Sequence, residues 1–256
     1  MPNIEKVKNE LKINGISHLG NYMTATLEFD DLIKKIHHIV SLLAKKYNLE
    51  SPDEDLDKIE DKIIELNLIN KRIGGFINDS MNASPELMKL FNCDRIKRLA
   101  NDFFDIRNVD LLSNNLRFRV QIPGHDNISN LPWHQDSHYN NMYNYNQSLV
   151  IWLSINSIYG KSGPIVFKKG SHAYKQLPRV DYTKPNGLKA FTIPDKYILD
   201  STFEDSSIDT KTGDILLIDV NLIHRSGFNE STNKIKLSSQ ARFHNSSADG
   251  FLAEYF

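Results

Sequence analysis

The chain has 256 residues, with 31 Lys and Arg against 32 Asp and Glu and a formal net charge of −1. Its hydrophobic content of 40% and charged content of 25% are typical of globular proteins and exclude wholesale disorder or a fibrous repeat. The balanced charge argues against nucleic acid or a membrane surface as a partner, because both are bound by basic patches.

The N-terminal sequence MPNIEKVKNELKING lacks the apolar stretch of a signal peptide, and no window approaches the roughly 18 apolar residues of a membrane-spanning helix. The single cysteine, Cys93, cannot form an internal disulfide, which suits a reducing compartment. We therefore expect a cytoplasmic protein. The sequence carries no indication of its oligomeric state.

Residues 1–110 have the periodicity of helices. In residues 27–46, apolar side chains recur at steps of three and four, and residues 53–69 repeat this pattern. Ser84 followed by Pro85 predicts a helix start, because Ser caps a helix and Pro at its first position loses no needed N–H. The expected elements are helices over 3–11, 27–46, 53–69 and 84–104, and a strand over 16–19.

From about residue 111 the pattern changes to short β-like runs separated by clusters of turn-forming residues. Strands without intervening helices predict a sandwich or barrel and disfavour βαβ units. The fold class expected is mainly β with flanking N-terminal helices, in a single domain over 1–256. The predicted strands cover 116–122, 148–155, 164–168, 214–220 and 236–243.

A long charged segment, residues 173–212, lies between two of these strands. Long insertions on a rigid β scaffold are often loops that face the substrate, although a merely solvated insertion is also open. We expect this segment to be either a lid over the substrate or a solvated surface insertion.

The sharpest motif is Trp133-His134-Gln135-Asp136. Alternate side chains of an extended segment share a face, so His134 and Asp136 can reach one metal ion together. A third candidate, His224, ends the apolar run DILLIDVNLIH. Two histidines and one carboxylate are the ligand set of non-haem Fe(II) oxygenases.

The strand after the turn at 229–231 has one polar face and one apolar face. Buried cations need an anion, so the polar face predicts an anion-binding interior beside the histidine. The polar face carries Lys234, Lys236, Ser238, Gln240 and Arg242, and the apolar face carries Ile235, Leu237, Ala241 and Phe243.

These segments together resemble the phytanoyl-CoA dioxygenase family of Fe(II)- and 2-oxoglutarate-dependent oxygenases. The resemblance runs in order through HQDSHY (134–139), SLVIWLSI (148–155), SGPIVFKKGSH (162–172) and GDILLIDVNLIHRSGFNES (213–231). It implies a double-stranded β-helix (jelly-roll, cupin-like) core over residues 111–245. It also implies His134, Asp136 and His224 as iron ligands, with Fe(II), 2-oxoglutarate and O2 as cofactor and co-substrates.

The resemblance further implies that Trp152 packs beside 2-oxoglutarate and that Ser226 contacts its distal carboxylate. The family usually has an Arg eleven residues after the distal His, but Ile235 stands there. One extra residue in the turn aligns Lys236 with that Arg. We expect Lys236 to bind the distal carboxylate, with Arg242 on the same strand face as the alternative.

The implied reaction is hydroxylation of a C–H bond of a small molecule, with release of succinate and CO2. The carboxylate ligand Asp136 favours this outcome, because halogenating relatives have a small residue there. Desaturation or cyclisation at the same iron is one alternative, and a non-catalytic metal-binding jelly roll is another. A cation opposite the distal carboxylate, Lys236 or Arg242, distinguishes the oxygenase from the inert protein.

Candidate substrate residues are less sharply defined. His138 and Tyr139 follow the metal motif and could line the pocket or only pack. Arg117, Arg119 and Gln121 share a strand face that could point inward, to bind an anion of the substrate or co-substrate, or to solvent, with Gln121 favoured as functional. The run NNMYNYNQ (140–147) would suit a polar substrate, or it could be an ordinary loop.

Overall fold

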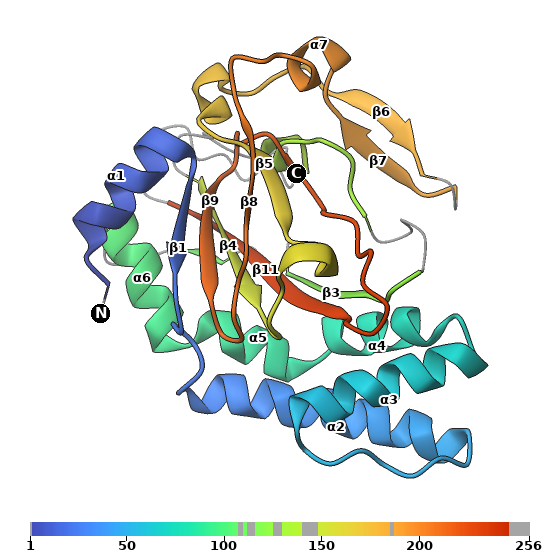
Figure 1. Ribbon diagram of the computed structural model, residues 1–256. Coiled ribbons are helices and arrows are strands. Elements are labelled where there is room, and N and C mark those ends of the chain that lie inside the picture. The colour runs from blue at the N-terminus through green and yellow to red at the C-terminus, as the bar shows by residue number, and fades with distance from the viewer. Residues whose placement is uncertain are drawn as a thin grey trace, which may run out of the picture.

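The computed structural model describes residues 2–106, 110–111, 116–124, 130–139, 148–184 and 187–245. Figure 1 shows β-sheets in the upper part of the molecule, with helices beneath them and along one side. Among the described residues, no helix is both long enough and apolar enough to cross a bilayer.

The larger sheet has the order β1-β9-β4-β11-β2, and β3 also pairs with β11. The long strand β11 pairs with β4 on one edge and with β3 and β2 on the other, all antiparallel. The edge strand of this sheet, β1, pairs with β9 and is the strand that was predicted over residues 16–19. The strands are β1 (Ile16–Leu19), β2 (Asp110–Leu111), β3 (Arg117–Gln121), β4 (Ser148–Ser154), β9 (Ile215–Asp219) and β11 (Lys236–His244).

A smaller sheet of order β10-β5-β8 and a separate hairpin of β6 and β7 complete the β structure. The strands are β5 (Ile165–Lys168), β6 (Val180–Thr183), β7 (Lys189–Thr192), β8 (Asp205–Ile208) and β10 (His224–Arg225). The segment 173–212 is therefore not a featureless insertion. It contains the hairpin, the short helix α7 (Asp195–Ile198) and, at its end, a strand that pairs with β5.

The apolar strands β4 and β9 are covered on both faces, which explains their near-continuous hydrophobic sequences. Leu149, Ile151 and Leu153 belong to the core shared with the helices. Val150 and Trp152 alternate with them and belong to the core between the two sheets. The apolar face of β11 likewise faces the helices, so its polar face is left for the interior.

The helices are α1 (Ile4–Asn14), α2 (Leu27–Lys46), α3 (Leu56–Ile69), α4 (Ile73–Asn82), α5 (Pro85–Asn92) and α6 (Asp94–Phe104). Side-chain caps fix several starts: Thr26 accepts from the Phe29 N–H and Ser84 from the Leu87 N–H. The predicted single helix over 84–104 is wrong, because the chain is extended at Cys93 between α5 and α6. The five-residue step from Phe91 to Ile96 breaks the helical spacing at this point.

Helix α4 was not predicted, because Gly74 and Gly75 weaken its helical signal. Its buried residues Ile73, Ile77 and Met81 nevertheless follow one face. A Cβ on Gly74 would lie 3.2 Å from Ile122 Cδ1, so the glycine lets α4 approach β3 closely.

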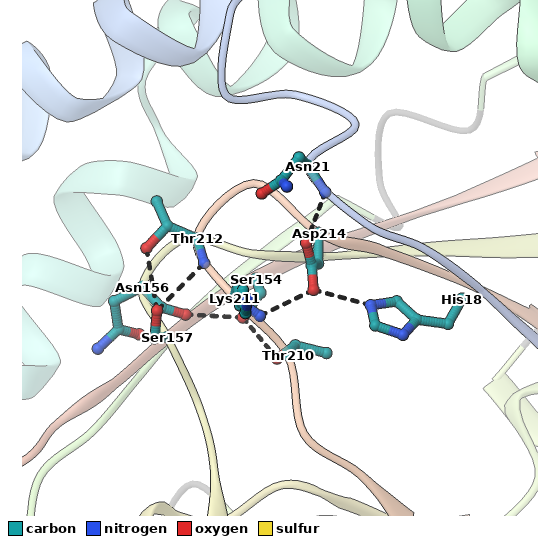
Figure 2. Close-up of polar contacts among 9 residues, drawn as sticks. All are labelled: His18, Asn21, Ser154, Asn156, Ser157, Thr210, Lys211, Thr212 and Asp214. Atoms are coloured by element: carbon teal, nitrogen blue, oxygen red, sulfur yellow. Dashed lines mark hydrogen bonds and ion pairs between the residues drawn. The ribbon is translucent and has the colours of Figure 1, made fainter. Parts of the chain in front are cut away.

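A polar network joins the turn before β9 to the ends of β1 and β4 (Figure 2). Asp214 accepts from the Asn21 N–H at 2.7 Å and lies 2.7 Å from His18 Nε2. Ser154 donates to the Asn156 carbonyl at 2.7 Å and lies 2.8 Å from Thr210 Oγ1. These contacts fix the start of β9, which leads to His224.

Candidate metal centre and its pocket

Two histidines pair through their backbones at the edge of the smaller sheet, where β10 lies. His134 and His224 form an isolated antiparallel bridge, in which each N–H donates to the other's carbonyl at 2.9 and 3.0 Å. Asp136 does not continue the extended segment, as the sequence suggested, but opens a 3-10 turn over Asp136–Tyr139. Even so, the ligand atoms of His134, Asp136 and His224 all lie within 4.8 Å of one another.

Each histidine is held in one tautomer. His134 Nδ1 donates to the Pro132 carbonyl at 2.7 Å, and His224 Nδ1 donates to the Leu222 carbonyl at 2.9 Å. The Nε2 atoms are therefore the ones left to bind a metal, with their lone pairs oriented by the backbone. Burial, followed by repulsion from His224, lowers the pKa of His134 well below its usual value, so the ring stays neutral as a ligand requires.

The carboxylate is divided between two tasks. Asp136 Oδ1 accepts from the Arg242 guanidinium, while the buried Oδ2 has no hydrogen-bond partner among the described residues and lies 3.6 Å from His224 Nε2. Burial by itself would raise the pKa of Asp136, but Arg242 and the two histidines reverse this and hold it low. An orphaned anionic oxygen beside two imidazoles fits a divalent cation, and the donor set fits Fe(II).

A pocket extends from this triad along the polar face of β11. Lys236 lies opposite Gln121 in the β11–β3 register. Of the predicted residues, those that line the pocket are Arg119, Gln121, His134, Asp136, Trp152, His224, Ser226 and Lys236.

Lys236 is a buried cationic residue that lines the pocket. Its Nζ donates to the Gly163 carbonyl at 2.6 Å and lies 5.9 Å from the centroid of the Trp152 ring. Burial, followed by repulsion from Arg119, lowers the pKa of Lys236 to about 7. An ammonium group in such surroundings is stabilised by an incoming carboxylate.

Neighbouring groups give this end of the pocket its shape. Gln121 Nε2 donates to the Gly227 carbonyl at 3.0 Å, and Ser226 Oγ accepts from the Leu131 N–H at 3.2 Å. A Cβ on Gly227 would lie 2.0 Å from the Pro164 carbonyl oxygen, so only glycine permits this close approach of two backbones.

Arg242 lies further along β11 and is not among the residues that line the pocket. Its guanidinium contacts Asp136 and lies 5.9 Å from the Tyr139 ring centroid. The two alternative cations thus have different surroundings: Lys236 borders the pocket, and Arg242 supports a metal-ligand candidate.

The weaker substrate candidates separate in the same way. The Tyr139 ring packs edge-on against His134 at 5.7 Å between centroids, and its hydroxyl accepts from the Phe191 N–H. Arg119 borders the pocket, whereas His138 is not among its lining residues and donates Nε2–H to the Leu177 carbonyl at 2.9 Å. The run 140–147 lies outside the described residues.

Two residues with a part in the site were not singled out from the sequence. Gln135 is fully buried, and its amide donates to the Lys175 and Asn221 carbonyls and accepts from the Leu177 N–H. Arg225 borders the pocket and covers the Trp133 ring at 5.2 Å. Their positions next to His134 and His224 were the only signal available.

Comparison with known proteins agrees with this geometry. The sequence profile of the family described as Phytanoyl-CoA dioxygenase (PhyH) matches residues 48–236. A sequence search of curated proteins finds no match.

Solved structures share the fold at low identity. The epimerase SnoN, in complex with Fe3+, alpha ketoglutarate and nogalamycin RO, aligns with a TM-score of 0.61 at 16% identity, over 95% of this chain and 84% of SnoN. EctD from S. alaskensis with bound Fe gives 0.61 at 17%, over 96% and 78%. The alpha ketoglutarate dependent carbocyclase SnoK gives 0.59 at 12%, over 94% and 84%.

These likenesses confirm the predicted double-stranded β-helix with N-terminal helices. The profile covers well over half of the chain, and the triad has two histidines and one carboxylate, the ligand types of non-haem iron sites. The chain belongs to the phytanoyl-CoA dioxygenase family, whose cofactors are Fe(II) and 2-oxoglutarate.

Proposed function

We propose that the protein is an Fe(II)- and 2-oxoglutarate-dependent hydroxylase of a small molecule, with His134, Asp136 and His224 as the iron ligands. The observation that carries this proposal is the orphaned Asp136 Oδ2 facing two histidines whose Nδ1 atoms are already bonded to backbone carbonyls. Both rings and the carboxylate are thereby pre-oriented toward one ion.

Lys236 is proposed to bind the distal carboxylate of 2-oxoglutarate, with Ser226 as a second donor. Lys236 is 6% exposed and borders the same pocket as the triad. Because a lysine is a point charge and not a planar fork, orientation of the carboxylate depends on its neighbours. Trp152 supplies a flat wall beside it, and Gln121 lies on the adjacent strand.

When bound, Fe(II) and 2-oxoglutarate supply, with O2, the oxidative decarboxylation that releases succinate and CO2 and the hydroxylation of the substrate. The chain's own residues position and isolate these groups. Arg242 holds Asp136 Oδ1, so that a single carboxylate oxygen is offered to the metal. All three ligand candidates are buried, which limits the access of bulk water to the centre.

The hairpin of β6 and β7 is proposed to cover the substrate side of the centre. Thr192 of β7 donates its hydroxyl to the Trp133 carbonyl at 2.8 Å, and the Phe191 N–H holds the Tyr139 hydroxyl. The segment 173–212 thus contacts Trp133, before the first metal-ligand candidate, and Tyr139, after Asp136, as a lid would.

The test is an anaerobic titration of the metal-free protein with Fe(II) and then 2-oxoglutarate, followed through the visible charge-transfer band of the chelate. The band is expected in the wild type, absent in His134→Ala and shifted to much higher 2-oxoglutarate concentration in Lys236→Ala. Iron binding without a band at any 2-oxoglutarate concentration would instead indicate a metal-binding jelly roll without oxygenase activity.

Hydroxylation is proposed over desaturation, cyclisation or epimerisation, although the similar structures include an epimerase and a carbocyclase. Once a substrate is found, the mass difference between substrate and product identifies the reaction. A gain of one oxygen atom supports hydroxylation, and a loss of two hydrogen atoms supports desaturation or ring closure.

A further inference from the structure

A second cavity adjoins the metal pocket. This cleft, of about 450 Å³, lies between α3, α4, β3 and the β6–β7 hairpin. Its lining residues include Asn67, Gly75, Val120, Ile122, Leu131 and Tyr139, together with five cationic side chains.

The charge of the cleft is one-sided. Lys71, Arg117, Arg119, Lys184 and Lys189 line it, and no acidic side chain is among its described lining residues. Two of these cations have neutral hydrogen-bond partners: Arg117 donates to the Leu116 carbonyl at 2.8 Å and Lys189 to the Thr183 hydroxyl at 2.9 Å. Clefts lined by one sign of charge concentrate ligands of the opposite sign.

Two of these cations, the buried Lys184 and the more exposed Arg117, are partly desolvated. Lys184 is only 9% exposed, and burial, followed by repulsion from Arg119, lowers its pKa to about 8. Burial, followed by repulsion from Arg242, lowers the pKa of Arg117. Positive groups that are desolvated near one another are stabilised by a bound anion.

The cleft adjoins the metal pocket. Arg119 and Leu131 line both the cleft and the metal pocket. Tyr139, which lines the cleft, packs against the ring of His134. A ligand in the cleft therefore lies next to the metal centre, with Tyr139 between it and His134.

Polar and apolar groups complete the lining. Asn67 is 4% exposed, and its Oδ1 has no hydrogen-bond partner among the described residues, so it offers an acceptor to a ligand hydroxyl. Val120, Ile122 and Leu131 offer apolar contacts.

We propose that the substrate carries an anionic group of the phosphate or carboxylate type, bound in this cleft by Arg117, Lys184 and Lys189 at a distance from the carbon that reacts. This inference rests on the proposed function for its reaction, but not for its binding site. The site for this group is separate from the one assigned to the distal carboxylate of 2-oxoglutarate, where Lys236 lies.

The test uses the holoenzyme, loaded with Fe(II) and 2-oxoglutarate without oxygen, and three matched probes: phenyl phosphate, benzoate and benzyl alcohol. Binding is measured by titration calorimetry at constant ionic strength. We expect an anionic probe to bind at least about tenfold more tightly than benzyl alcohol, since charge-assisted hydrogen bonds are worth that factor or more.

We expect the affinity for the anionic probe to fall about fivefold to tenfold in each of three variants, Lys184→Gln, Lys189→Gln and Arg117→Gln. Lys97→Gln is the matched control, because Lys97 is exposed on α6 and lines neither cavity. It should change the affinity by less than about twofold. Lys189 is exposed, so its replacement tests the cleft without disturbing a buried residue.

Equal binding of the three probes, no measurable anion binding, or an equal effect of Lys97→Gln would overturn the proposal. Tighter binding of phenyl phosphate or of benzoate identifies the anion preferred. The charge-transfer band, read in the same samples, separates the two proposals. If the wild type shows no band but binds the anion in a Lys184-dependent way, only the proposed function is wrong. If the band is normal but no anion binds, only the cleft proposal is wrong.

Discussion

His134 and His224, which are 90 residues apart in the chain, are joined as a backbone bridge pair with their rings 4.2 Å apart. The bridge places the two imidazoles side by side before any metal binds. Asp136 completes the set because its 3-10 turn brings the carboxylate to the same point. The placement of the two imidazoles is therefore determined by main-chain hydrogen bonds, which single side-chain changes leave in place.

Replacing His134 by Ala is expected to abolish stoichiometric Fe(II) binding without unfolding the protein. The matched control is His138→Ala, which removes a second buried histidine four residues away whose ring bonds the Leu177 carbonyl. Iron content after anaerobic loading, measured beside the circular dichroism spectrum, checks this. Equal iron loss in both variants would contradict the assignment.

Replacing Lys236 by Ala should raise the Kd of 2-oxoglutarate about 10- to 100-fold, which is the value of a charged hydrogen bond. Lys234→Ala is the control, because Lys234 pairs with Asp57 at the surface two residues away. Titration of the charge-transfer band gives both affinities. If Lys236→Ala had the Kd of the wild type, another cation would have to bind the distal carboxylate of 2-oxoglutarate.

The affinity for 2-oxoglutarate should depend on pH through the same residue. The pKa of Lys236 is about 7 without ligand, and a bound carboxylate raises it, so binding takes up a proton above pH 7. We expect a constant Kd below pH 7 and about a tenfold rise per pH unit above it, until the pKa of the complex is reached. Lys236→Arg, which stays charged, should flatten the profile.

Replacing Arg242 by Gln tests whether it supports the metal ligand or binds 2-oxoglutarate. Since the guanidinium contacts Asp136, iron affinity should fall about 10- to 100-fold, as for other partners of metal ligands. The Kd of 2-oxoglutarate at saturating iron should change little. A larger effect on 2-oxoglutarate than on iron would contradict this reading.

Glu60 offers a test of stability away from the site. It is 4% exposed and accepts from Asn156, and burial raises its pKa to about 7. At low pH the Glu60 carboxyl is neutral in both the folded and the unfolded protein. Above its pKa in the unfolded protein, it ionises more readily there than in the folded protein. The loss of folding free energy therefore grows up to pH 7 and then levels off. Glu60→Gln should therefore stabilise the protein by on the order of 1–3 kcal/mol at pH 8, and little at pH 4.

Urea denaturation at the two pH values measures this difference. Glu65→Gln, on the exposed side of the same helix, is the control and should have little effect at either pH. A loss of stability at pH 8 in Glu60→Gln would show that the charged carboxylate contributes more to the fold than its burial costs.

Much of the fold could be predicted because local patterns determine it. Helix α2 and strand β1 have the predicted bounds, and the predicted split of β11 into a polar and an apolar face is confirmed. Periodicity failed at α4, where two glycines hide a buried face, and at β8, whose short polar sequence resembles a loop. In both cases the stabilising contacts come from distant segments, Ile122 and β5.

The sequence by itself determined the chemistry available: two histidines and an aspartate in the order of a known family, and a lysine displaced from the usual arginine position. Tertiary structure alone decided which groups meet, because those contacts depend on strand register and on packing between segments far apart in the chain. The register of β11 sets Lys236 beside the pocket and Arg242 against Asp136. The approach of α4 and of the β6–β7 hairpin to β3 gathers Lys71, Arg117 and Lys184 into one cleft, a grouping that the sequence alone does not show.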